Sequence, residues 1–122
     1  MLAKGLFEIN LNPQKDDNPA GRILIDKTYN GDLKGVGIGQ MISKRTESGS
    51  AIYYAIEEFS GQLNGKSGSF TLIHNGVMSK EEQSLEVFVL EGSGEGELSN
   101  IAGALHIIQE NGTHAYEFSY TL

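Results

Sequence analysis

Along most of this chain, apolar and polar residues alternate one by one, and no segment keeps apolar residues at helical spacing for several turns. Such alternation places the apolar side chains on one face of an extended strand. We therefore predict eight β-strands. Their ranges are Leu6–Asn12, Arg22–Asn30, Val36–Arg45, Ala51–Phe59, Ser69–Ser79, Ser84–Leu90, Ala104–Glu110 and Ala115–Thr121.

Turn-forming sequences separate these strands. The dipeptides Asn30-Gly31, Asn64-Gly65 and Asn111-Gly112 favour the positive backbone angles of tight hairpins. Asn75-Gly76 lies inside a strand-like run, where it predicts a bulge. Ser79–Glu82 matches a box that can begin a helix, but no apolar stripe follows it, so we interpret it as a polar hairpin loop.

Eight consecutive strands with short links form either an up-and-down barrel or a two-sheet sandwich. Closure into a barrel removes the strand edges that an open sheet would expose. Three glycines in the third strand, at positions 35, 37 and 39, permit the strong coiling that closure needs. We predict a single all-β domain over residues 1–122, an eight-stranded antiparallel up-and-down barrel.

The charge and composition exclude several classes of function. The formal net charge is −7 and the nine Lys and Arg residues are scattered, which argues against nucleic acid or an anionic membrane surface as a partner. The chain has no cysteine, no evident signal peptide and no apolar stretch long enough to span a bilayer. The three histidines lack metal-ligand spacing. We expect a cytoplasmic protein with no metal and no cofactor.

Two titratable residues on neighbouring predicted strands form the strongest candidate for chemistry. Glu57 shares a strand face with Tyr53, and His74 shares one with Phe70. A hairpin closed around residues 61–68 would turn both faces into the same interior, where desolvation would suit Glu57 and His74 to acid–base catalysis. Alternatively, the two side chains only satisfy each other's hydrogen bonds, or they face solvent.

The last predicted strand carries aromatic residues at alternate positions. Tyr116 and Phe118, together with Tyr53 and Phe70, would form a wall for an apolar ligand. The same aromatic face would equally serve as an ordinary barrel core or as a subunit interface.

Three blocks of the sequence carry a resemblance to a known family. They are Lys27–Gly35, Gly61–Phe70 with His74 after it, and Gly92–Leu98 with Gly103 beyond. Together they resemble a bacterial family of unknown function assigned to the allene-oxide-cyclase-like barrels. The resemblance implies an eight-stranded barrel with a central cavity, but no reaction. The wider group includes plant cyclases acting on fatty-acid epoxides, whose pocket uses a cysteine that this chain lacks, and dirigent proteins.

These observations lead to one expected function and two alternatives. We expect a barrel that binds a small, largely apolar molecule in its lumen. The alternatives are a cyclase or isomerase with Glu57 and His74 as acid and base, and a structural or protein-binding barrel with a filled core. Apolar residues on both faces of several strands, as in Ile23–Ile25 and Val87–Leu90, predict a homo-oligomer.

Overall fold

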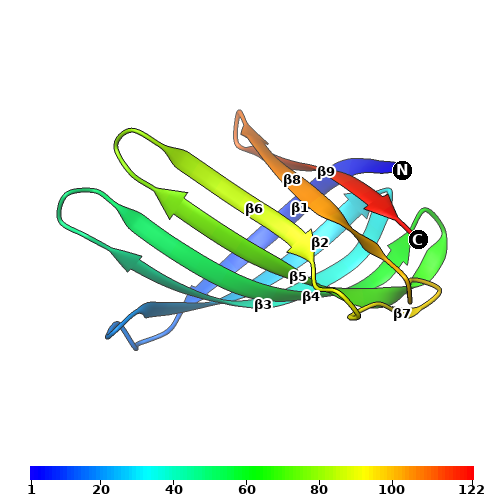
Figure 1. The fold of residues 1–122 in the computed structure, drawn as a ribbon, viewed down its shortest axis with the longest axis horizontal. Helices are drawn as coiled ribbons and strands as arrows, with labels where there is room; N and C mark the ends of the chain where they lie inside the picture. The colour runs from blue at the N-terminus through cyan, green and yellow to red at the C-terminus, as the bar shows by residue number, and fades with distance from the viewer.

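The computed structural model describes residues 1–122 and confirms the all-β prediction, with a closed eight-stranded antiparallel barrel and one additional two-residue strand (Figure 1). No helix in it has the length and apolar character needed to cross a membrane. The strands are β1 (Leu2–Pro13), β2 (Gly21–Gly31), β3 (Leu33–Arg45), β4 (Ala51–Leu63), β5 (Lys66–Met78), β6 (Gln83–Val89), β7 (Glu95–Gly96), β8 (Ala102–Glu110) and β9 (Thr113–Thr121).

The barrel closes because neighbouring strands pair in chain order and the first strand pairs with the last. Pairing runs from β1 through β2, β3, β4, β5, β6, β8 and β9 back to β1. Strand β6 is short and covers only the Leu72–Met78 half of β5, while β7 pairs with Gly68 and Ser69 in the other half. The segment between β6 and β8 therefore folds over one end of the barrel (Figure 1).

The tight hairpins confirm two of the three predicted turns. Asn64 and Gly65 have φ of 48° and 84°, and Asn111 and Gly112 have φ of 51° and 78°, as a two-residue turn matched to strand twist requires. The Asn30-Gly31 prediction holds only for Gly31, which has a φ of 105°, because both residues still belong to β2 and the chain turns after them.

The predicted bulge at Asn75-Gly76 is also wrong. Gly76 pairs in regular register with Tyr53 on one side and Leu85 on the other. A Cβ atom on Gly76 would lie 2.3 Å from the Tyr53 ring, so glycine stands there to admit that ring into the interior. Ser79 begins a hairpin loop as predicted, with its Oγ accepting a hydrogen bond from the Glu82 N–H at 3.0 Å.

We expect Gly65→Val to lower the free energy of unfolding by about 1–3 kcal/mol, because a β-branched residue is strained at a φ of 84°. Urea unfolding measures the effect. Gly21→Val is the matched control, since a Cβ there meets nothing closer than 3.8 Å. An unchanged unfolding midpoint for Gly65→Val would contradict the strain argument.

One end of the barrel is filled by its own side chains. Three leucines that each follow a glycine by two residues in the sequence, Leu33, Leu63 and Leu98, are fully buried there. A series of aromatic rings continues the packing, with successive centroids 5.0–5.7 Å apart, and consists of Tyr29, Phe59, Phe70, Phe118 and Tyr120. These leucines and aromatic rings thus seal this end, and the filled-core alternative describes only this half of the lumen.

Candidate functional site

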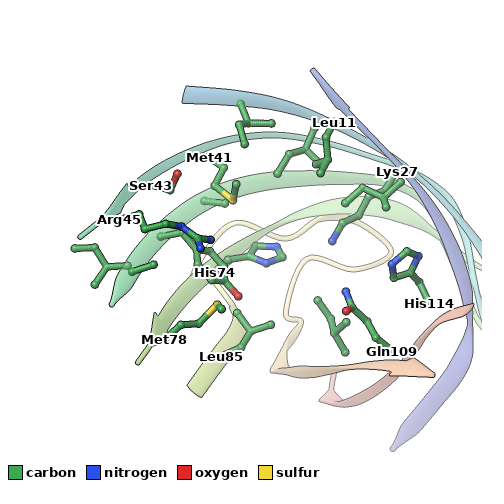
Figure 2. A pocket seen from close by; sticks show the side chains of 18 of the residues that line it. Leu11, Lys27, Met41, Ser43, Arg45, His74, Met78, Leu85, Gln109 and His114 are labelled. Carbon is green, nitrogen blue, oxygen red and sulfur yellow. The ribbon is translucent and has the colours of Figure 1, made fainter. Parts of the chain in front are cut away.

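The other half of the lumen is open. A cavity of about 430 Å³ extends inward from the end that carries the loops after β1, β3, β5 and β8 (Figure 2). Thirteen of its 20 lining residues are apolar. Its walls come from every long strand of the barrel, and include Ile9, Ile25, Met41, Leu85 and Ile107. An open, apolar half above a sealed half gives the barrel the form of a cup.

A cluster of four polar side chains lies where the cavity meets the packed half. The Glu57 carboxylate is its centre: Oε1 accepts hydrogen bonds from Lys27 Nζ at 3.1 Å and from His74 Nε2 at 2.8 Å, and Oε2 accepts one from the Tyr29 hydroxyl. Glu57 is 1% exposed, Lys27 5% and His74 7%. A carboxylate this deeply buried is tolerated because three donors replace its water.

Gly37 on β3, the strand between β2 and β4, leaves space for the Glu57 carboxylate. A Cβ atom on Gly37 would lie 2.1 Å from Glu57 Oε2 and 3.0 Å from the ring of Tyr29. Glu57 on β4 and Tyr29 on β2 are separated by β3, so their hydrogen bond crosses directly over Gly37. Any larger residue there would break the contact.

The electrostatics of the cluster keep Glu57 ionised. Burial by itself would raise the pKa of Glu57, but the hydrogen bonds from His74 and Tyr29 and the charge of Lys27 outweigh it and lower this pKa from 4.5 to about 2. Burial and the adjacent Glu57 carboxylate raise the pKa of Tyr29 well above its ordinary value, so its hydroxyl stays a donor.

Two groups of the cluster face the cavity with unused hydrogen-bonding capacity. Because the ionised Glu57 only accepts, His74 Nε2 carries a proton and donates it. No hydrogen bond engages His74 Nδ1, and every buried side-chain nitrogen and oxygen atom has a partner, so Nδ1 is open to the cavity. Lys27 Nζ has three N–H donors and uses one of them within the protein, toward Glu57.

The structure brings together the two residues predicted as an acid–base pair and separates the four predicted for ligand binding. Glu57 and His74 are in direct contact, and Tyr53 and His74 line the cavity. Burial raises the pKa of Tyr53 above its ordinary value. Phe70, Tyr116 and Phe118 do not line the cavity and are buried in the packed half instead.

Those three residues have structural roles in the sealed half. Phe70 and Phe118 stack with ring centroids 5.7 Å apart. The Tyr116 hydroxyl accepts a hydrogen bond from the Leu33 N–H at 2.8 Å and donates to the Asn30 carbonyl at 2.9 Å, which ties down the turn between β2 and β3. Strand alternation predicts that they point inward, but it does not predict their depth along the barrel axis.

No group of three or more His, Cys, Asp or Glu side chains comes together in an arrangement that could hold a metal ion.

The family model described as "Protein of unknown function (DUF3224)" matches residues 3–120. The chain belongs to the DUF3224 family. A crystal structure of a DUF3224 protein with unknown function from Shewanella oneidensis MR-1 is 38% identical and superposes with a TM-score of 0.93, covering 99% of this chain and 96% of that one. No curated protein matches the chain.

Lys27 and Tyr29 are the site residues of this DUF3224 protein that our sequence reasoning missed. A signal was present, because alternation along β2 places Lys27 on the same inward face as Ile25 and Tyr29. A lysine whose side chain points into the barrel needs a buried partner of opposite charge, and Glu57 is the carboxylate that pairs with it.

Proposed function

We propose that this DUF3224 protein binds a small, largely apolar molecule in the open half of the barrel. The observation that carries the proposal is the cavity of about 430 Å³, whose size falls within the range of roughly 300–1,000 Å³ that is usual for ligand sites. Its lining follows the usual composition of such sites, mostly apolar walls with a few convergent polar groups.

The cavity volume limits the size of the ligand. At roughly 30 Å³ per non-hydrogen atom, the share of volume that a water molecule takes in the liquid, the cavity holds about 14 such atoms. A chain or ring system of that size would replace water along walls that include Ile9, Ile25 and Ile107. Release of that water from apolar surface would supply most of the affinity.

We expect Ala55→Phe to weaken the binding of 1-octanol, a neutral apolar probe of suitable size, by about tenfold or more. Ala55 is buried, lines the cavity and pairs with His74 across the hairpin, so a phenyl ring there would occupy ligand space. Isothermal titration calorimetry measures the affinity. Ser60→Phe, on the exposed face of the same strand, is the matched control.

Each outcome of this experiment is decisive. Binding by the parent protein and by Ser60→Phe, with loss in Ala55→Phe, supports the lumen as the site. Equal binding by Ala55→Phe would place the probe elsewhere on the molecule and overturn the proposal. Thermal unfolding of the three proteins shows that each is folded at the titration temperature.

A cyclase or isomerase of the allene-oxide-cyclase-like kind is the second candidate, and the orientation of His74 favours it. Glu57 holds Nε2 of the imidazole and leaves Nδ1 free toward the cavity, as a proton-transfer group requires. Glu57 itself is a poor base, because its pKa is about 2 and both its oxygens already accept hydrogen bonds. In such an enzyme, His74 would transfer the proton and Glu57 would hold the His74 imidazole in position.

We also propose that two copies of this chain associate through the outer face of β3, β4 and β5. This face exposes large apolar residues, with Ile38 and Ile56 each 62% exposed. A groove on it is flanked by the anion Glu58 and by the cation Arg22, which also pairs with Asp16 at 3.0 Å within its own chain. A twofold contact could therefore pair opposite charges without the repulsion that a net charge of −7 imposes elsewhere.

For this assembly we expect light scattering to return twice the chain mass of 13.2 kDa. Ile56→Glu is expected to yield monomers, because it places a like charge near its own symmetry copy, whereas Thr28→Glu on the outward face of β2 is expected to leave the dimer intact. A monomer mass for the parent chain at all concentrations would contradict the proposal.

The cytoplasmic location inferred from the sequence stays a prediction.

A further inference from the structure

We infer that the lumen ligand carries a single carboxylate, and that this head group binds at the cavity floor to Lys27 while its apolar body points to the mouth. The inference rests on the proposed binding function and specifies the class of molecule.

The charged side chains that line the cavity are positive, although the chain as a whole is negative. The protein has 16 Asp and Glu residues against nine Lys and Arg residues. None of the 20 lining residues is acidic, whereas three are Lys or Arg and two of the three histidines of the chain are among them. These five residues are Lys27, Lys44, Arg45, His74 and His114. With three cations and no carboxylate, this lining would favour an anion over a neutral or cationic molecule.

The floor supplies directed donors at one place. Lys27 Nζ lies 4.8 Å from the centroid of the Phe7 ring, and the His114 ring stacks on the same phenylalanine at 5.2 Å. The Lys27 ammonium and the His114 ring point toward the same part of the cavity (Figure 2). With two N–H donors of Lys27 unused, an oxygen anion fits this position.

The floor attracts an anion more strongly than the mouth does. Lys27 is 5% exposed and is fixed by Glu57 and by the Phe7 ring, so it loses little entropy and little hydration when an anion binds. Lys44 and Arg45 are exposed at the end of β3, where water and salt weaken their attraction. The apolar walls lie between Lys27 at the inner end and Lys44 and Arg45 at the mouth. The carboxylate of the ligand would therefore lie at the inner end and its apolar body toward the mouth.

The floor suits a singly charged anion better than a multiply charged one. The charge of Lys27 is already shared with the ionised Glu57, whose Oε1 is 3.1 Å away. That carboxylate repels a dianion such as a phosphate monoester about twice as strongly as a monocarboxylate, whereas either anion can use the free donors of Lys27. A monocarboxylic acid with an apolar chain or ring body, within the size that the cavity holds, is therefore the chemical class that we assign.

The experiment compares octanoate with 1-octanol, which differ in the head group and share the apolar chain. By isothermal titration calorimetry, the parent protein is expected to bind octanoate about tenfold or more tightly than octanol, as a buried charge-assisted hydrogen bond implies. The variant Lys27→Met/Glu57→Gln, which removes both charges of the buried pair together and so avoids an unpaired ion, is expected to lose this preference and retain octanol binding.

Lys66→Met is the matched control, because it removes one lysine charge at the exposed hairpin of the sealed end. It is expected to keep the octanoate preference. Equal affinity of the parent protein for both probes would overturn the carboxylate inference and leave lumen binding intact. A preference that survives in the double variant and disappears in Arg45→Met would overturn the floor position. Failure of the parent protein to bind either probe would overturn the proposed function itself.

Discussion

Glu57→Gln is expected to lower the free energy of unfolding by about 3–5 kcal/mol, the largest effect of any single change at the site. Glutamine keeps the shape of the side chain but removes the charge that balances the buried Lys27 ammonium. Lys27 then remains in an apolar surrounding with a neutral partner. Urea unfolding followed by circular dichroism measures the loss.

Two companion variants separate this effect from a general loss of a carboxylate. Glu8→Gln, at an exposed position of β1 outside the proposed dimer face, is expected to change stability by no more than about 0.5 kcal/mol. Lys27→Met/Glu57→Gln is expected to recover much of the loss, because no charge stays buried without its partner. A double variant as unstable as Glu57→Gln would show that packing, and not the unpaired charge, causes the destabilisation.

The second large effect is a loss of stability in acid. The pKa of Glu57 is lowered from 4.5 to about 2 by its three donors, so the unfolded chain binds a proton at this residue at a higher pH than the folded protein does. The resulting stabilisation is fully present above pH 4.5 and is lost as the pH falls toward 2. The difference corresponds to about 3 kcal/mol.

The measurement is the difference in stability between the parent protein and Glu57→Gln at several pH values, which cancels the contributions of the other carboxylates. We expect the difference to be constant between pH 5 and 7 and to shrink by about 3 kcal/mol as the pH falls from 4.5 to 2. The corresponding difference for Glu8→Gln is expected to stay flat. A difference for Glu57→Gln that does not change with pH would mean that Glu57 has an ordinary pKa in the folded protein.

The strands and most of their turns were predictable from the sequence because they depend on local properties. Alternation of apolar and polar residues determines which side chains face inward, and Asn64-Gly65 determines a two-residue turn. That turn sets the register of β4 against β5, and with it the contact between Glu57 and His74. A prediction over one hairpin needs no knowledge of the rest of the barrel.

Lys27 and Tyr29 could not be joined to Glu57 in the same way. They lie on β2, and β3 separates them from β4, so their contact depends on how far one side chain reaches across an intervening strand. Gly37 permits that reach by leaving space for the carboxylate. As one of three glycines in its strand, it gave no sign in the sequence that its role differs from that of its neighbours.

The sequence by itself determined the all-β class, the inward set of side chains and the hairpin pair of Glu57 and His74. Only the tertiary structure decided which inward residues line the cavity and which fill the sealed end. Tyr53 and Phe70 alternate in the same way along their strands, yet one faces the cavity and the other is buried in the aromatic packing. The reason is that alternation specifies a face, whereas depth along the barrel depends on the tilt and stagger of all eight strands, which are set together when the barrel closes.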